Sequence, residues 1–96
     1  MCTMPTRKFK IKGRVQGVGF RWFSRTQAIN LGLSGTTRNM LNGDVEVVVE
    51  GSNQDLVKMK SLLSEGPPSS RVDSIDTKET ADDLGLGFEI LPTPSK

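Results

Sequence analysis

The sequence has no histidine, and only one cysteine, Cys2, among its 96 residues. Without histidine the chain lacks both the commonest general base and the commonest metal ligand. A single cysteine excludes an internal disulfide bond, which suits a reducing compartment. Residues 1–6 contain no apolar run, and no stretch approaches the roughly 20 apolar residues that span a bilayer. We therefore expect no signal peptide, no membrane segment and a cytoplasmic protein.

The excess of positive charge is also small, because the chain has 13 basic and 11 acidic residues and hence a net charge of +2. That excess does not by itself indicate nucleic-acid binding, but it is compatible with a local positive site for a small anion. With 34% hydrophobic and 25% charged residues the composition is that of an ordinary globular protein. We expect one domain over residues 7–91, between a disordered N-terminus at 1–6 and a flexible C-terminus at 92–96.

The most informative stretch is Gly13–Arg21, which reads GRVQGVGFR and lies between a strand pattern and a helix pattern. Gly17 and Gly19 free the backbone for positive φ, so that successive N–H groups can turn toward one point and bind an anion. The N-terminus of the following helix adds about half a positive charge, and Arg21 offers a planar fork of donors. This stretch therefore predicts a loop that holds a phosphoryl group.

Three familiar phosphate loops do not match this stretch. A dinucleotide-binding loop needs a third glycine where Trp22 stands, and a nucleotide P-loop ends in Gly-Lys-Ser/Thr rather than Gly-Phe-Arg. Cysteine-dependent phosphatases carry a thiolate at the position that Val15 occupies here. Any hydrolysis at this loop must therefore use water instead of a covalent phospho-enzyme formed at that position.

The rest of the chain predicts alternating strands and helices. We expect strands at 7–14, 34–41, 44–51, 71–78 and 88–91, and helices at 20–31 and from Ser52 to Gly66. Asn42-Gly43 predicts a two-residue type I′ hairpin. Right-handed crossovers then give a ferredoxin-like α+β sandwich, in which two helices cover one face of an antiparallel sheet. Such a fold hosts many functions, so function must come from the site.

Within these elements each polar position has a structural and a functional interpretation. Arg21 either forms a surface salt bridge or binds an anion. The helix dipole is positive at the helix start, so a cation there is unfavourable unless an anion is bound. Asn39 either satisfies a turn or serves the site, and Arg38 should face away from it into solvent. Trp22 lies at the helix edge or at the mouth of the site. Asp82 and Asp83 are interpreted as solvated carboxylates.

The stretch Gly13–Arg21 resembles the signature of the acylphosphatase family, and the similarity continues through Gly32–Asn39 and Asn42–Gly51. It extends from about Lys8 to Ile90, with Thr36-Thr37 in place of the family's usual Trp-Val. The resemblance implies hydrolysis of the carboxyl–phosphate bond of small acyl phosphates, without metal or cofactor, by a monomer. It assigns catalysis to Arg21 and Asn39. It assigns phosphate binding to the loop residues Val15, Gln16, Gly17, Val18, Gly19, Phe20 and Arg21.

In the mechanism that the resemblance implies, Asn39 orients the attacking water and a phosphate oxygen of the substrate takes its proton. Inorganic phosphate or sulfate should compete for the loop. One alternative is a phosphate- or carbamoyl-phosphate-binding module without turnover, as in the acylphosphatase-like domain of hydrogenase-maturation proteins. A second is an RNA-binding domain that uses Lys8, Lys10 and Lys12, although this face lacks the exposed aromatic pair of sheet-type RNA readers. We expect neither nucleic acid nor membrane as a partner.

Overall fold

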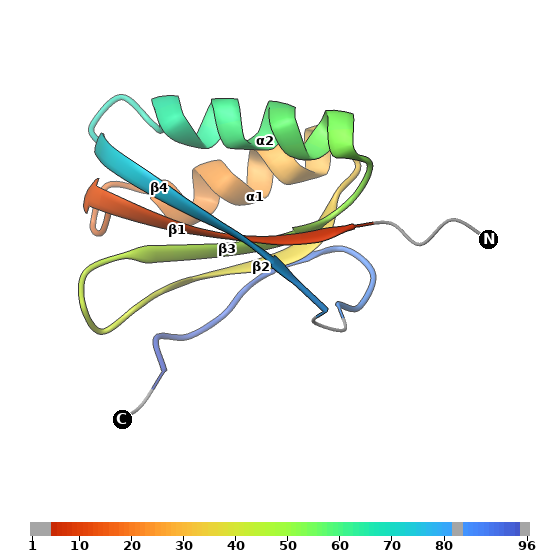
Figure 1. Cartoon of the computed structure of the whole chain (residues 1–96). Helices are drawn as coiled ribbons and strands as arrows, with labels where there is room; N and C mark the ends of the chain where they lie inside the picture. The colour runs from red at the N-terminus through yellow and green to blue at the C-terminus, as the bar shows by residue number, and fades with distance from the viewer. Residues whose placement is uncertain (1–4, 82–83, 95–96) are drawn as a thin grey trace.

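A computed structural model describes residues 5–81 and 84–94 of the chain (Figure 1). Two helices lie on one face of a five-stranded sheet whose strand order is β4-β1-β3-β2-β5. This arrangement confirms the expected ferredoxin-like fold. The expectations for Cys2, Asp82 and Asp83 fall outside the described residues. The elements are β1 (Thr6–Arg14), α1 (Phe20–Asn30), β2 (Ser34–Asn39), β3 (Val45–Glu50), α2 (Asn53–Glu65), β4 (Arg71–Thr80) and β5 (Phe88–Ile90).

The sheet is mixed, which corrects the expectation of a wholly antiparallel one. β1 pairs antiparallel with β3 and β4, and β2 pairs antiparallel with β3. β5 instead runs parallel to β2, with Phe88 beside Gly35. The reason is topological: successive antiparallel pairs make β2 run opposite to β4, and β5 returns along the other edge of the sheet in the direction opposite to β4, so it is parallel to β2.

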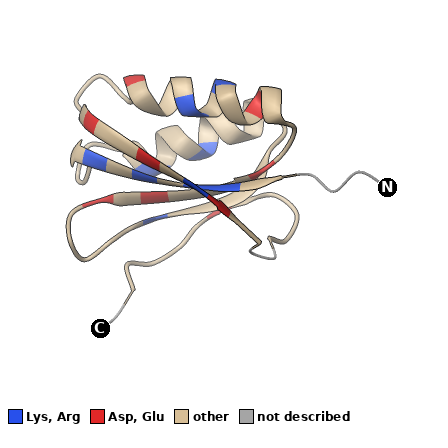
Figure 2. Cartoon of the chain, in the orientation of Figure 1, with Lys and Arg blue, Asp and Glu red and all other residues tan. Residues whose placement is uncertain are grey.

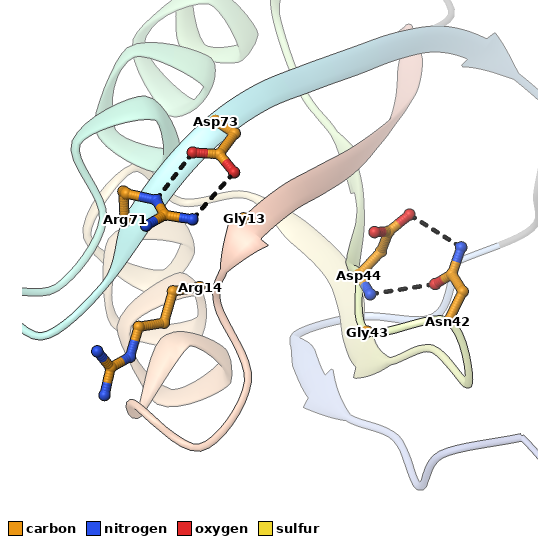
Figure 3. A pocket seen from close by; sticks show the side chains of 7 residues that line it. All are labelled: Gly13, Arg14, Asn42, Gly43, Asp44, Arg71 and Asp73. Carbon is orange, nitrogen blue, oxygen red and sulfur yellow. Dashed lines mark hydrogen bonds and ion pairs between the residues drawn. The ribbon is translucent and has the colours of Figure 1, made fainter.

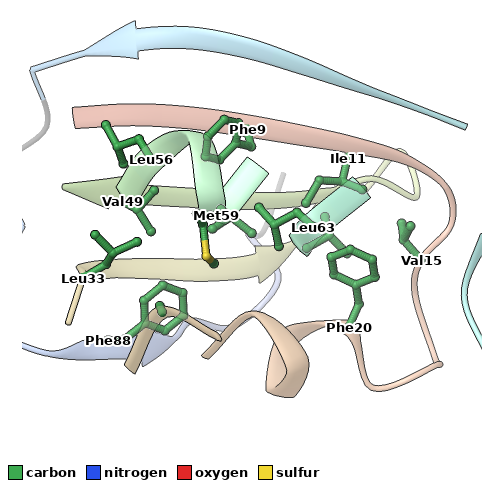
Figure 4. Close-up of a cluster of buried hydrophobic side chains, with 13 residues drawn as sticks. Phe9, Ile11, Val15, Phe20, Leu33, Val49, Leu56, Met59, Leu63 and Phe88 are labelled. Carbon is green, nitrogen blue, oxygen red and sulfur yellow. The ribbon is translucent and has the colours of Figure 1, made fainter. Parts of the chain in front are cut away.

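The core lies between the sheet and the two helices, as Figure 4 shows. Val45, Val47 and Val49 of β3 are fully buried on the helix-facing side, as their alternation predicts. The opposite face of β3 is less exposed than expected, because Glu46 and Val48 are also buried. The helices contribute the expected stripes, of which the fully buried apolar members are Phe20, Ala28, Leu56, Met59 and Leu63.

Local signals explain where the helices begin and end. The Ser52 hydroxyl accepts a hydrogen bond from the N–H of Asp55 at 3.1 Å, so Ser52 caps α2 as expected. Gly66 ends the same helix with a φ of 67°, and Gly32 follows α1 with a φ of 72°. In the described residues, no helix is long and apolar enough to cross a membrane.

The hairpin between β2 and β3 differs from the expected type I′ turn. Its loop has three residues, since the N–H of Met40 donates to the carbonyl of Asp44 at 2.8 Å. Gly43 has a φ of 98°, and no non-glycine residue of the described chain has a positive φ, so Asn42 does not adopt the I′ conformation. The Asn42 side chain instead accepts from the N–H of Asp44 at 3.1 Å. This local bond competes with the I′ geometry, and β2 consequently ends at Asn39.

The ends of the domain differ slightly from the expected boundaries. Thr6 already belongs to β1 and is buried, one residue before the start that the sequence predicts. The carbonyl of Pro5 accepts a hydrogen bond from the N–H of Gly51 at 3.1 Å. Residues 92–94 follow β5 without regular structure.

Thr37 carries a buried hydroxyl with no hydrogen-bond partner in the described part of the chain. We expect Thr37→Val to stabilise the fold by about 1 kcal/mol, because valine has nearly the same shape and removes the desolvated group. In a domain of this size the melting temperature should rise by roughly 4–8 °C. The matched control is Ser24→Ala, since the equally buried Ser24 hydroxyl donates to the carbonyl of Phe20 at 2.8 Å and should give no such gain. A Thr37→Val protein that melts at or below the wild-type temperature would contradict this.

Candidate active site

The loop Val15–Gly19 leaves the sheet at an irregularity in β1. The register between β1 and β4 shifts between Lys12 and Gly13. Gly13 has a φ of 133°, and a Cβ there would lie 2.1 Å from the carbonyl oxygen of Arg71. Only glycine therefore fits at this bulge, which turns the chain out of the sheet toward α1.

Two further glycines shape the loop itself. Gly17 and Gly19 have φ values of 75° and 79°, the left-handed conformation that the sequence predicts. No atom lies within 4 Å of a Cβ built at either position. The requirement for glycine therefore comes from the backbone conformation and not from lack of space.

The loop and the start of α1 leave backbone donors unused. The N–H groups from Gln16 to Gly19 form no hydrogen bond of normal geometry with another described residue. The helical ladder begins with the N–H of Phe23 donating to the carbonyl of Gly19 at 3.0 Å. No side chain caps this helix, and its first turn contains no acidic residue. The helix start therefore offers donors and a positive dipole without an internal anion to satisfy them.

The described arginines differ in whether they have a partner. The side chains of Arg14, Arg21 and Arg25 have no hydrogen bond or ion pair with any described residue. Arg21 is half-buried at the second position of α1. The other described arginines all have partners: Arg7 with Asn53 and Glu79, Arg38 with Glu46, and Arg71 with Asp73. The Arg21 guanidinium is thus left without a partner in the described chain at the helix start where the free N–H groups lie.

Asn39 occupies the end of β2, on the helix-facing side of the sheet. It lies opposite Val45 of β3, which in turn lies opposite Ile11 of β1, so the three side chains share one face. Asn39 is half-buried, and its side chain has no hydrogen-bond partner among the residues described. Its amide is therefore available to a ligand or to water.

Gln16 connects the loop to this end of β2. Its side-chain Nε2 donates to the carbonyl of Met40 at 2.8 Å and to the carbonyl of Asp44 at 2.9 Å. Met40 is the residue after Asn39, so the structure brings the loop beside the expected water-orienting residue. The sequence interpretation assigned only the backbone of Gln16 to the site and missed its side chain. The available signal was weak: Gln16 is the one long polar side chain between Val15 and Phe20.

The other residues that the sequence analysis named lie partly in the core and partly at the surface. The side chains of Val15 and Phe20 belong to the core, so each could serve a ligand only through its backbone. Trp22 is exposed. Arg38 faces away from Asn39 as expected, but the expectation that it is solvent-exposed is wrong. It is half-buried and lies 3.4 Å from the buried Glu46, its direct cross-strand neighbour.

A groove adjoins the loop on the side of Gly13 and Arg14 (Figure 3). Its charged groups are largely paired with one another. Arg71 donates to both carboxylate oxygens of Asp73, at 3.0 and 3.4 Å, and Asn42 donates to the carboxylate of Asp44 at 3.1 Å. No sequence pattern indicated this groove, and Arg14 is the one charged side chain of its lining without a partner among the described residues.

The lysine-rich face of β1 is also balanced by acidic residues, and Figure 2 shows both signs interleaved along the strands. Lys10 lies between Glu46 and Asp76 in the sheet, and Lys12 is 3.8 Å from Asp76. Such alternation favours a solvated face over a nucleic-acid surface. Among the described residues, no group of three His, Cys, Asp or Glu side chains is placed to hold a metal ion.

Comparison with known proteins shows the family of the chain. The family model for acylphosphatase matches residues 7–90. The chain belongs to the acylphosphatase family. This is a family of enzymes, and its curated members include an acylphosphatase of Koribacter versatilis, 44% identical over 88% of this chain and 76% of that protein. An acylphosphatase of Bradyrhizobium diazoefficiens is 47% identical over 86% of this chain and 90% of its own length.

Solved structures show the same relationship. An acylphosphatase from Bacillus subtilis superimposes with a TM-score of 0.86 at 34% identity, and covers 92% of this chain and 99% of its own. Full-length HypF, solved in a phosphate- and nucleotide-bound form, matches with a TM-score of 0.85 at 32% identity. The HypF match covers 94% of this chain but only 12% of HypF. The same domain therefore also occurs within a much longer protein.

The unpaired Arg21 and the free loop N–H groups predict binding of inorganic phosphate. Titration should shift the amide NMR signals of Gly17, Val18 and Gly19, and Arg21→Ala should weaken the affinity by about 10- to 100-fold, because charge-assisted hydrogen bonds are lost. Arg21→Lys should recover little of it, since lysine keeps the charge but lacks the bidentate fork.

The matched control is Arg7→Ala, which removes an arginine at the opposite end of β1 and should leave the affinity unchanged. Shifts confined to Lys8, Lys10 and Lys12 would show that phosphate binds the outer face of the sheet and not the loop.

Proposed function

We propose that this protein hydrolyses the carboxyl–phosphate bond of small acyl phosphates, giving a carboxylate and inorganic phosphate. The observation that carries the proposal is the set of unused donors at one place. The loop N–H groups and the Arg21 guanidinium have no partner among the described residues, and Gln16 ties that loop to the strand end that carries Asn39. Membership of the acylphosphatase family supports the same reaction.

In the proposed mechanism the residues Val15 to Phe20 hold the phosphate oxygens through their N–H groups, and Arg21 neutralises the charge that remains. Asn39 holds a water molecule for attack on phosphorus. The phosphorus–oxygen bond to the acyl group breaks, and the carboxylate leaves with its electron pair. A phosphate oxygen of the substrate takes the proton of the water. In phosphoryl transfer the protein mainly positions the reactants and stabilises the charge of the transition state. A chain without histidine can therefore catalyse the reaction.

The main competing function is binding without turnover, because HypF contains a domain of the same fold. A binding module needs donors for the phosphate but no residue that orients water. The half-buried Asn39 amide, without a partner in the described chain and beside the loop, favours an enzyme. Relatives named acylphosphatase, matched over most of their own length, point the same way.

The finer features of the proposal follow from the same site. Inorganic phosphate or sulfate should act as a competing anion, because each presents the oxygens that the loop would hold. We further propose that the protein works as a monomer in the cytoplasm, with no nucleic acid as a partner. The interleaved charges of the outer sheet face support the last point.

The first test is release of phosphate from acetyl phosphate or benzoyl phosphate in the presence of excess EDTA. We expect turnover to survive chelation, since the proposed stabilisation of charge comes from N–H groups and Arg21. Phosphate binding without any release would favour the binding module. Loss of turnover with EDTA, restored by Mg²⁺ or Zn²⁺, would show that the metal-free mechanism is wrong.

Asn39→Ala separates the two functions more sharply. A misplaced nucleophile costs about 10² in rate, so kcat should fall by about that factor while KM and the affinity for phosphate change little. The melting temperature of the variant provides the control for folding. A folded variant with wild-type kcat would remove Asn39 from the mechanism. A loss of phosphate affinity as large as that of Arg21→Ala would mean that Asn39 holds the phosphate and not the water.

A further inference from the structure

The side chain of Gln16 bridges two parts of the chain that are distant in sequence. Its Nε2 lies 2.8 Å from the carbonyl oxygen of Met40 and 2.9 Å from that of Asp44. Both partners are acceptors, so the nitrogen and not the oxygen of the amide must face them. Both N–H bonds of the amide are thereby used, and the orientation of the side chain is fixed.

The hairpin does not need Gln16 to satisfy its own carbonyl groups. The carbonyl of Met40 also accepts from the N–H of Gly43 at 3.2 Å, and that of Asp44 accepts from the N–H of Met40 at 2.8 Å. Removal of the glutamine amide would leave each carbonyl with a backbone partner. The two bonds therefore contribute little to closing the hairpin, and what they specify is the position of the loop against it.

The bridge meets the hairpin directly beside Asn39. Met40 follows Asn39 in β2, and Asp44 precedes Val45, the cross-strand neighbour of Asn39. Gln16 thus contacts the two hairpin residues that adjoin the end of β2 and the start of β3, at the end of the pair that carries the asparagine. Since Gln16 itself lies in the phosphate loop, one side chain links the proposed phosphate ligands to the proposed water ligand.

We propose that Gln16 is a positioning residue that sets Asn39, and hence the attacking water, against the phosphate held by the loop. The inference rests on the proposed function. In-line attack requires the water to be aligned with the phosphorus–oxygen bond that breaks, and in the proposed mechanism the water and the phosphate are held by two different elements, β2 and the loop with α1. An error of about 1 Å between them can cost 10²-fold in rate. Without Gln16 the loop would stay anchored at Val15 and Phe20, but its distance from β2 would no longer be fixed.

The experiment compares Gln16→Met with Asn42→Ala. Methionine keeps the length and loses both donors, whereas Asn42→Ala removes two hydrogen bonds within the same hairpin and leaves the bridge intact. We expect Gln16→Met to lower kcat for acetyl phosphate by about 10- to 100-fold, with KM and inorganic phosphate affinity near the wild-type values. Asn42→Ala should leave kcat unchanged. Wild-type kcat in Gln16→Met, or a loss of phosphate affinity matching that of Arg21→Ala, would overturn the inference.

A double-mutant cycle tests whether Gln16 acts through Asn39. In the Asn39→Ala background, Gln16→Met should lower kcat little further, because the residue that it positions is already absent. Equal losses in both backgrounds would indicate a general structural effect and would overturn the proposal. If Gln16→Met does not fold, Gln16→Asn serves instead, since its side chain is one methylene too short to reach both carbonyls.

An NMR measurement keeps this inference distinct from the proposed function. The side-chain amide signals of Asn39 should shift in Gln16→Met and much less in Asn42→Ala, whether or not the protein turns over substrate. If wild-type protein releases no phosphate from acyl phosphates, the proposed function fails and these signals still decide whether Gln16 positions Asn39. Unchanged Asn39 signals in Gln16→Met would overturn the inference even in an active enzyme.

Discussion

Burial of Val15 and Phe20 is the constraint on which the site depends. Each side chain is 1% exposed and packs in the core, at opposite ends of the loop (Figure 4). The chain must therefore reverse between two fixed points, and the left-handed Gly17 and Gly19 make that possible. The short path leaves the loop N–H groups without internal acceptors. The hydrophobic burial that folds β1 and α1 thus also creates the donors for an anion.

The distribution of charge matters more here than its total. A net charge of +2 says little, whereas the partners of the individual arginines are informative. Arg7, Arg38 and Arg71 each have a polar or acidic partner, whereas Arg21 at the start of α1 has none among the described residues. A free cation at the positive end of a helix is unfavourable by itself. A bound phosphoryl group would offset both the unpaired guanidinium and the uncapped helix start.

Sequence patterns predicted those features that depend on neighbours along the chain. The alternation of β3, the buried stripe of α2 and the cap at Ser52 all follow from spacing alone. The wrong predictions involve contacts between side chains or strands that spacing does not specify. The Asn42 side chain accepts a hydrogen bond from the N–H of Asp44, and the hairpin is therefore not a type I′ turn. Glu46 of the neighbouring strand forms an ion pair with Arg38. β5 pairs in parallel with β2. Residue types predicted the phosphate loop, and the resemblance to the family assigned Asn39 to the site, but only the fold shows that the Gln16 side chain connects the loop with the hairpin beside Asn39.

The Thr36-Thr37 pair affects the energy of the fold more than the geometry of β2. β2 pairs with β3 from Ser34 to Asn39 without a shift of register, so the two threonines do not tilt the strand. On its other side the carbonyl of Thr37 accepts from the N–H of Leu91 at 2.8 Å, which holds the same stretch in place. The cost is confined to a buried hydroxyl without a partner in the described structure. Asn39, two residues farther along the same face, therefore stays where β2 and the Gln16 bridge place it.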